Sequence, residues 1–217
     1  GIYMFNRDLL VDVLRRSAYQ DFGNEVFPSL IEPSNVQVHL FDGYWEDIGT
    51  IRAFYEANLQ LASDESPFDL VSPEAPIYSR ARFLPPSRLS GSNVNASLIA
   101  DGCQISPGVT IENSVIGLRC VIGRNVTIRD SILMGNDGYE TQNELHDDQQ
   151  CERPPIGVGD DSVILGAIID KNCRIGRGVR IEAPADGAVR EDRPECTVQD
   201  GIPVLCKGAI LHDGWHF

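Results

Sequence analysis

Two adjacent acids, Glu46 and Asp47, lie in the most chemically suggestive stretch of the chain, Tyr44–Thr50. This stretch follows an expected strand and ends in a Gly-Thr pair that opens an expected helix. In an α/β sheet the ligand crevice lies beyond the carboxyl ends of the strands. Because successive strand residues face opposite sides, only one of the two carboxylates can face such a crevice. A carboxylate there can hold Mg²⁺ together with phosphate oxygens, and a solvated acidic pair beside a helix cap is the alternative.

The elements that must position this stretch alternate between strand and helix over residues 1–62, which predicts the tail of an α/β domain. The expected strands are Ile2–Phe5 and Val36–Phe41, and the expected helices are Arg7–Arg16, a short one up to Ile31, and Ile51 to about Ala62. Asn6 and Thr50 are the expected N-caps, and residues 21–25 are expected to form a loop. Since the chain enters a strand directly after Gly1, we expect it to be the later part of a longer chain.

Residues 63–88 have no hydrophobic periodicity and predict an extended linker. Five of the chain's prolines lie there, at positions 67, 73, 76, 85 and 86.

An aliphatic residue returns at every sixth position through much of the remaining chain, residues 89–217. The registered runs are Ile99, Ile105 and Ile111; Ile116, Ile122 and Ile128; and Val163, Ile169, Ile175 and Ile181. This interval is typical of a parallel β-helix of hexapeptide repeats, in which the repeated residue points into the shaft. Glycine often follows the inward residue, as in Ile116-Gly117, and we interpret it as a corner residue with positive φ.

Two stretches break these repeats. Residues 135–155 are polar and are expected to lie outside the shaft, and residues 184–201 are irregular. Val204 and Ile210 are expected to resume the inward positions, and His216-Phe217 to end the chain outside the solenoid.

The composition is that of an ordinary soluble protein, with 42% hydrophobic residues and a formal net charge of −14. The charge argues against a nucleic-acid partner and against an anionic membrane surface. There is no apolar run of roughly 18 residues and no signal-peptide pattern. The six cysteines lack metal-ligand spacing, which fits a reducing cytoplasm without disulfides, and Cys103 and Cys120 are expected to stack as small wall residues.

Several motifs occur in order before and within the repeats, and together they resemble a known family. They are Gly1-Ile2-Tyr3, Asp21–Glu25, Tyr44–Thr50, Arg82–Pro86, Met134–Asp137, Pro155–Gly159 and Ile168–Asn172. This set resembles ADP-glucose pyrophosphorylase (glucose-1-phosphate adenylyltransferase), and most closely its cyanobacterial and plant small-subunit branch. The resemblance implies a nucleotidyltransferase Rossmann-like domain followed by a left-handed β-helix with a regulatory and oligomerisation role.

The resemblance also implies an activity and its site residues. ATP and glucose 1-phosphate give ADP-glucose and pyrophosphate for glycogen or starch synthesis, with Mg²⁺ as cofactor. Asp47 matches a catalytic, metal-binding carboxylate that contacts substrate, and Glu46 is at most an orienting neighbour. The family's Gly-rich nucleotide loop, its first metal carboxylate and its sugar-phosphate lysine have no counterpart in the sequence. Residues 1–217 alone are therefore expected to be inactive.

Basic residues are informative in this chain, since 18 lysines and arginines stand against 32 acids. By the resemblance, Lys171 and Lys207 match lysines that bind anionic activators. Arg82, and with a weaker match Arg80, belong to a phosphate-type regulatory site. Arginine forks and lysine point charges both suit phosphorylated metabolites. The resemblance suggests 3-phosphoglycerate as activator and inorganic phosphate as inhibitor.

Two alternatives stay open at the level of sequence. One is another sugar-1-phosphate nucleotidyltransferase with a β-helix tail, such as a mannose or glucosamine type. The other is a catalytically silent regulatory subunit. The resemblance further implies a homotetramer, which fits the unpaired backbone and apolar wall that an open coil leaves at its end.

Overall fold

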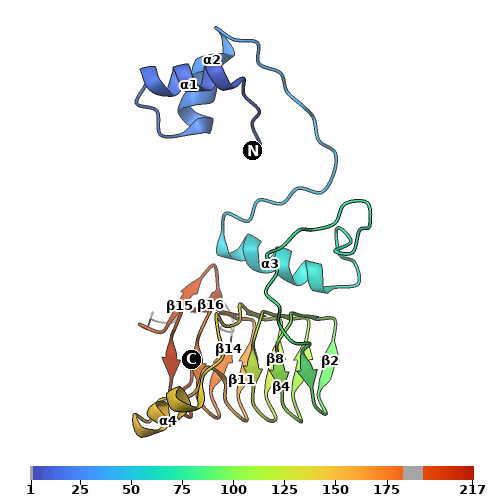
Figure 1. Ribbon diagram of the computed structural model, residues 1–217, viewed down its shortest axis with the longest axis vertical. Helices are drawn as coiled ribbons and strands as arrows, with labels where there is room; N and C mark the ends of the chain where they lie inside the picture. The colour runs from blue at the N-terminus through green and yellow to red at the C-terminus, as the bar shows by residue number, and fades with distance from the viewer. Residues whose placement is uncertain (1, 183–192) are drawn as a thin grey trace. The chain divides into compact units, whose positions relative to one another are not determined.

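The computed structural model describes residues 2–182 and 193–217, and the chain forms two compact units, Gly1–Gly43 and Tyr44–Phe217 (Figure 1). The sequence-based boundaries at residues 62 and 88 remain predictions.

The first unit is helical. It contains α1 (Arg7–Arg16), a π-helical turn η1 (Phe22–Val26) and α2 (Phe27–Ile31). Asn6 caps α1 as expected, because its side-chain oxygen accepts the N–H groups of Asp8 and Leu9 at 3.1 and 3.4 Å. Val26 and Leu30 form the buried centre of this unit.

Three sequence-based assignments in this unit are wrong. Ile2–Phe5 and Val36–Phe41 are irregular rather than strands, and the residues expected as a loop at 21–25 begin the π-helical turn. A strand gains its stability from a neighbour that completes its backbone hydrogen bonds. The described residues of this unit provide no such neighbour, so the alternating pattern alone does not produce a sheet.

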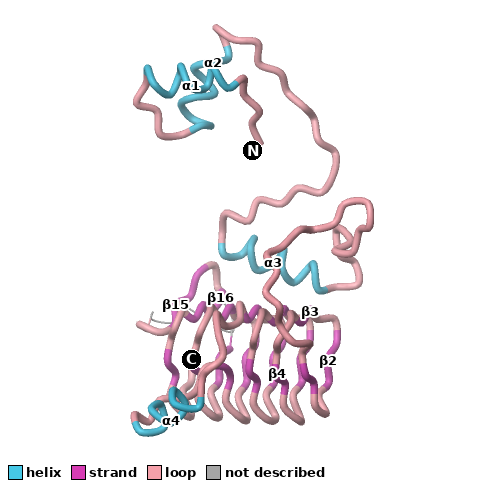
Figure 2. The backbone as a smooth tube through the Cα atoms, viewed as in Figure 1, coloured by secondary structure: helices cyan, strands magenta, loops and turns pink. Residues whose placement is uncertain are grey.

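The second unit is dominated by a parallel β-helix built from three sheets, here named A, B and C (Figure 2). Sheet A contains β1 (Arg88–Leu89), β4 (Gln104–Ile105), β7 (Val121–Ile122), β10 (Gly157–Val158), β13 (Arg174–Ile175) and β17 (Ile210–Leu211). Sheet B contains β2 (Asn93–Asn95), β5 (Thr110–Glu112), β8 (Thr127–Arg129), β11 (Val163–Leu165) and β14 (Arg180–Glu182). Sheet C contains β3 (Leu98–Ile99), β6 (Val115–Ile116), β9 (Ile132–Leu133), β12 (Ile168–Ile169), β15 (Cys196–Gln199) and β16 (Ile202–Leu205).

One regular coil takes 17 residues, since Ile105 pairs with Ile122 and Ile111 with Ile128. Two faces of the coil therefore have the six-residue interval and the third has five. The five-residue face explains the error of phase at Val163, because the interval from the buried Ile164 to the buried Ile169 is five residues. The error at Val204 and Ile210 has a different cause, since the irregular 184–201 stretch precedes them and interrupts the count. Ile164, Leu205 and Leu211 are fully buried, whereas the expected Val163, Val204 and Ile210 are half-buried.

Gly117, Gly123 and Gly176 serve a close approach between coils rather than a positive φ, whereas Gly157, after Ile156, has the expected positive φ, of 119°. A Cβ on Gly117 would lie 2.5 Å from the carbonyl oxygen of Met134 in the next coil, and this glycine does not have a positive φ. Left-handed corner conformations fall instead on residues such as Asn113, Asn125 and Asn172. Asparagine tolerates that region better than most residues with a side chain.

Both breaks in the repeats carry structure of their own. Most of the 135–155 stretch lies outside the shaft as expected, and it contains α4 (Gln142–Gln150), which Thr141 and Glu144 begin with a capping box. The expectation is wrong for Gly135 and Asn136, which are buried in a corner of the coil. Of the 184–201 stretch, residues 184–192 lie outside the described residues. Cys196–Gln199 pair antiparallel with β16 as a hairpin.

The last three residues close the shaft, so the expectation that His216-Phe217 lies outside the solenoid is wrong. Phe217 is buried against the core, and its ring stacks on Trp215 at 5.8 Å between centroids. The Arg193 guanidinium lies 5.2 Å from the Trp215 ring centroid. The apolar end of the last coil needs a cover, and these aromatic rings provide it.

Helix α3 (Ile51–Ala62) packs on the outer face of sheet C (Figure 1). Its apolar face contacts Ile132, Ile168 and Ile202 through Ile51, Phe54, Tyr55 and Leu59. Thr50 caps the helix as expected by accepting the Ala53 N–H at 3.1 Å. The Tyr55 hydroxyl donates to the Asp130 carbonyl, and burial together with the nearby Asp130 carboxylate raises the pKa of Tyr55 to about 12. This helix thus joins the Tyr44–Thr50 stretch to the β-helix.

None of the six cysteines, all in the described ranges, forms a disulfide, and Cys103 and Cys120 are buried in the wall as expected. Among the described residues, no helix is both long and apolar enough to cross a membrane.

Candidate functional site

The Tyr44–Thr50 stretch is irregular backbone that leads directly into α3. Glu46 and Asp47 are both exposed. Asp47 Oδ1 accepts the Gly49 N–H at 3.0 Å, which folds the chain into a tight Asx turn before the helix cap. Asp47 Oδ2 has no hydrogen-bond or ion-pair partner among the described residues, and the same holds for the Glu46 carboxylate.

The donor set around Asp47 fits a magnesium ion that is shared with a substrate. Mg²⁺ is held in nucleotide enzymes by one or two carboxylates, and water and phosphate oxygens complete its shell. Asp47 has one oxygen available for such a bond. The described residues contain no group of three or more His, Cys, Asp or Glu side chains that could hold a metal by themselves. Asp47 therefore suits the role of one protein ligand, and the described residues supply no cluster of carboxylates beside it.

A cleft of about 620 Å³ opens beside this stretch. Its lining residues are Ile48, Gly49, Thr50, Ile51, Phe54, Met134, Ile168, Asp170, Gln199, Asp200 and Val204. The start of α3 forms one wall and sheet C with the β15–β16 hairpin forms the other. Asp200 anchors the two walls, because its carboxylate accepts the Arg52 N–H at 3.1 Å.

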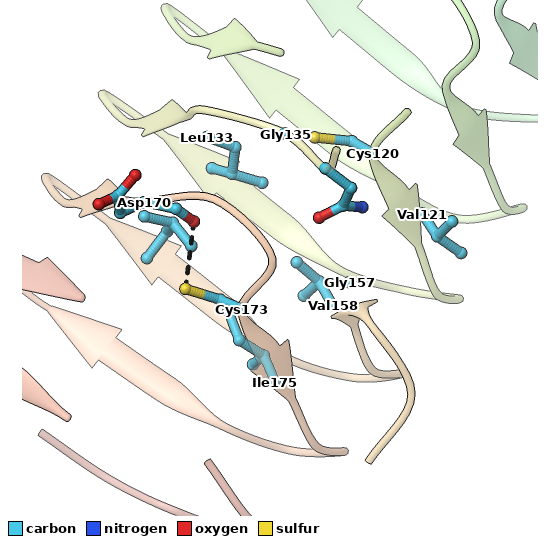
Figure 3. A pocket seen from close by; sticks show the side chains of 11 residues that line it. Cys120, Val121, Leu133, Gly135, Gly157, Val158, Asp170, Cys173 and Ile175 are labelled. Atoms are coloured by element: carbon cyan, nitrogen blue, oxygen red, sulfur yellow. Dashed lines mark hydrogen bonds between the residues drawn. The ribbon is translucent and has the colours of Figure 1, made fainter. Parts of the chain in front are cut away.

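A second space, of about 20 Å³, lies within the coil wall between Cys120, Val158 and Cys173 (Figure 3). The Cys173 thiol donates to the Asp170 carbonyl at 3.1 Å across its edge. The volume is about that of one water molecule and the lining is mostly apolar, so this space is a packing defect rather than a ligand site.

Lys171 and Lys207 lie together at one corner of the β-helix, and both pair with Asp137. Lys171 Nζ is 3.0 Å from Asp137 Oδ1, and Lys207 Nζ is 3.6 Å from Asp137 Oδ2. Asn172 adds a reciprocal pair, since its Nδ2 donates to Asp137 Oδ2 at 2.9 Å and its Oδ1 accepts the Asp137 N–H at 2.8 Å. The hydrogen bonds from Asn172 and Lys171 lower the pKa of Asp137 to about 2. This set, Asp137, Lys171, Asn172 and Lys207, is called the lysine corner below.

Coil stacking produces the lysine corner. Strands β9, β12 and β16 are neighbours in sheet C, with Ile169 paired to both Leu133 and Leu205. The turns that follow these strands therefore stack, as two backbone bonds show: Asn172 N–H donates to the Gly135 carbonyl, and Gly208 N–H to the Lys171 carbonyl. Three turns remote in sequence thus present their side chains at one place.

The 135–155 insertion is anchored beside the lysine corner by a buried ionic cluster. Arg174 Nη1 lies 2.8 Å from Glu140 Oε1 and 2.6 Å from Asp148 Oδ2, and it also donates to the Pro154 carbonyl at 2.8 Å. Burial raises the pKa of Glu140, and its hydrogen bond with Asp148 acts in the same direction. Burial opposes ionisation of Asp148 too, yet its hydrogen bonds with Glu140 and Arg174 lower the pKa of Asp148 overall. Glu140 is the member of the pair that holds a proton more readily.

Arg80 and Arg82 lie in the exposed linker, away from such contacts. The Arg82 side chain donates to the Arg80 carbonyl at 3.3 Å. Within the described ranges, no hydrogen bond or ion pair joins either arginine to the lysine corner. The structure thus brings the two lysines together, and the shared site with the arginines remains a prediction.

Two family models match the chain. The model described as the GLGC left-handed parallel β-helix domain matches residues 82–215, which is more than half of the chain. The model described as nucleotidyl transferase matches residues 1–64. The three stacked sheets agree with the first match, and the predicted fold class is confirmed. The chain therefore belongs to the ADP-glucose pyrophosphorylase-like proteins, which combine a nucleotidyltransferase domain with a left-handed parallel β-helix of the GLGC type.

Proposed function

We propose that the chain is part of a glucose-1-phosphate adenylyltransferase that makes ADP-glucose and pyrophosphate for glycogen or starch synthesis. The observation that carries the proposal is the pair of family matches in one chain, a nucleotidyltransferase segment followed by a GLGC-type β-helix. The Tyr44–Thr50 and Arg82–Pro86 motifs support the adenylyl and glucose specificity over a mannose or glucosamine type.

In the proposed reaction the phosphate of glucose 1-phosphate attacks the α-phosphorus of ATP, and pyrophosphate leaves. Such a transfer needs alignment of the reactants and neutralisation of developing charge, with little covalent work for the protein. Magnesium bound to the phosphates would supply that neutralisation. The role proposed for Asp47 is to bind and orient the metal through its unpaired Oδ2, while the Gly49 N–H holds Oδ1. Glu46 is proposed as an orienting neighbour.

Replacement of Asp47 tests this assignment in the full-length enzyme. Asp47→Ala should lower the turnover of ADP-glucose synthesis by about 10²-fold or more, because metal stabilisation of the transition state is worth several kcal/mol. The exposed Asp42, five residues earlier, is a matched control, and Asp42→Ala should retain turnover. Thermal unfolding of both variants should match the parent protein. Near-normal turnover of Asp47→Ala would remove the assignment.

We further propose that Lys171 and Lys207, with Arg82 and Arg80 of the linker, bind phosphorylated metabolites that regulate the enzyme. Support comes from the lysine corner, where two cations lie within 4 Å of one carboxylate on an exposed face. 3-Phosphoglycerate is the proposed activator and inorganic phosphate the proposed inhibitor. Loss of activation in a Lys171→Ala/Lys207→Ala double variant is the expected result.

The proposed assembly is a homotetramer, in the cytoplasm. Leu89, in the first strand of sheet A, is 46% exposed, whereas Phe217 covers the last coil, so the first coil is the end that offers apolar surface to another subunit. Light scattering coupled to size-exclusion chromatography measures the mass; a monomer at micromolar concentration would contradict the tetramer.

A further inference from the structure

The two lysines of the lysine corner are the two lysines of the whole sequence, and both pair with the same acid, Asp137. Asp137 is not held there by the lysines alone. Its reciprocal hydrogen bonds with the Asn172 side chain fix the carboxylate between the two amines. Asn172 in turn is set in place by a left-handed backbone conformation with φ of 61°. The side chains of Asp137, Lys171 and Lys207 are all about half exposed, so solutes can reach them.

Other charges at the corner favour an anion there. Arg119, one coil earlier, donates from Nη1 to the carbonyl of Asn136 at 3.2 Å, which places a third cation next to the residue before Asp137. The Asp170 carboxylate accepts a hydrogen bond from the Lys171 N–H at 2.6 Å and so stabilises the backbone turn. Lys171 and Lys207 together carry two positive charges against the single carboxylate of Asp137 with which both pair, so this group of three side chains keeps a net positive charge in a strongly acidic protein.

We propose that Asp137 is an internal anion that occupies the place of the effector's phosphate or carboxylate group and must give up the lysines when the effector binds. Asp137 would then set the concentration at which effectors act. This inference rests on the proposed effector site and adds a regulating residue to it. Because the pKa of Asp137 is about 2, the carboxylate stays ionised across the physiological range, and its competition does not depend on pH there.

The size of the effect follows from the exposure of the pairs. An exposed ion pair shifts an equilibrium by between about 1.4- and 5-fold. An anion must replace two such pairs, so Asp137→Asn should tighten anion binding by about 2- to 30-fold. Asparagine keeps the shape and can still pair with Asn172, which leaves the turn intact.

The test uses the 217-residue chain labelled with ¹³C-lysine, which gives one set of side-chain signals for each of two lysines. Inorganic phosphate is titrated at pH 8 and constant ionic strength, because exposed pairs are sensitive to salt. Asp161→Asn is the matched control. Asp161 is also an exposed corner acid that pairs with an asparagine, Asn125 at 3.0 Å, but it lies at the corner after sheet A. This control removes the same formal charge without touching the lysines.

The expected result is a lower dissociation constant for phosphate in Asp137→Asn, with no change in Asp161→Asn and no lysine response in a Lys171→Ala/Asp137→Asn variant. Binding of phosphate to Asp137→Asn alone, and not to the parent chain, would also support the proposal. An unchanged or weaker affinity in Asp137→Asn, with clear binding to the parent chain, would overturn the role of Asp137 and leave the effector site standing. Absence of phosphate binding in every form would overturn the effector site and the role of Asp137 together.

Discussion

The packing of α3 on the β-helix can be tested by substitution of Tyr55. Its hydroxyl donates to the Asp130 carbonyl, and its ring packs with Phe54 and Leu59 against sheet C. Tyr55→Phe keeps the ring and removes the hydroxyl. A hydrogen bond of this kind contributes about 0.5–1.5 kcal/mol, so the variant should lose about 1 kcal/mol of unfolding free energy at pH 8.

The pH dependence gives the same contact a second signature. The pKa of Tyr55 is raised to about 12 in the folded chain from an ordinary value of 10. A raised pKa means that the protonated hydroxyl stabilises the fold below pH 10 and that this contribution disappears as the pH rises through 12. Two pKa units correspond to about 2.7 kcal/mol. Tyr55 is only half-buried, so solvent screening should reduce the effect to about 1 kcal/mol.

The assay is urea unfolding of the parent chain, Tyr55→Phe and Tyr78→Phe between pH 8 and pH 11.5, combined with hydrogen exchange of residues 51–62. Tyr78 is a matched control because its side chain is 91% exposed. The parent chain and Tyr78→Phe should lose more stability than Tyr55→Phe over this range, and α3 should show faster exchange in Tyr55→Phe at pH 8. Parallel pH profiles in all three proteins would refute the role given to this hydrogen bond.

Three further predictions concern the β-helix. Ser131→Ala removes the buried hydroxyl that accepts the Ala167 N–H at 3.2 Å, so it should cost about 1–3 kcal/mol of unfolding free energy and speed exchange of the Ala167 amide. Ser106→Ala is the control and should change the unfolding free energy by no more than about 0.5 kcal/mol. Equal effects of the two substitutions would argue against the role of the Ser131 hydroxyl. Phe217→Ala should destabilise the last coil by about 3 kcal/mol in urea unfolding, because the ring is buried. His216→Ala should not destabilise it, because the His216 side chain is exposed. An unchanged unfolding midpoint for Phe217→Ala would contradict the proposal that the aromatic rings cover the last coil. Because burial raises the pKa of Glu140, its protonated form stabilises the insertion at low pH, and this contribution is lost as the pH rises through the raised value. Hydrogen-exchange protection of residues 142–150, corrected for intrinsic exchange, should therefore be greater near pH 4.5 than at pH 7, and Glu140→Gln should abolish the difference. Protection in the parent chain that does not change with pH would refute this role of Glu140.

Local signals were sufficient to predict much of the fold. Asn6 and Thr50 are strong N-caps followed by apolar residues at helical spacing, and both helices begin where these caps predict. The hexapeptide interval predicted the stacked sheets, because an inward aliphatic residue on each face is what a β-helix core requires.

The errors have physical reasons. Ile2–Phe5 has strand composition, but a strand also needs a partner, which its own sequence does not contain. The inward phase shifted at Ile164 because one face of each coil has five residues, so a strict six-residue count drifts by one position.

The pairing of Asp137 with the lysines was missed for a related reason. Leu133, Ile169 and Leu205 are neighbours in sheet C, yet each is 36 residues from the next rather than 17. Two insertions, each adding 19 residues to a coil, separate the turns after these three residues in the sequence, although the turns stack in the structure. Counting the inserted residues out of the repeat would have placed Asp137 beside Lys171. The metal role of Asp47 could be inferred only from resemblance, since the structure places its exposed carboxylate before α3 without a partner that reveals its chemistry.

The most direct test is ADP-glucose synthesis by the full-length enzyme from ATP and glucose 1-phosphate with magnesium, measured with and without 3-phosphoglycerate in the parent protein and in Lys171→Ala/Lys207→Ala. The expected result is product formation that the metabolite stimulates in the parent protein and fails to stimulate in the double variant. Absence of ADP-glucose, or equal stimulation of both proteins, would contradict an adenylyltransferase regulated at the lysine corner.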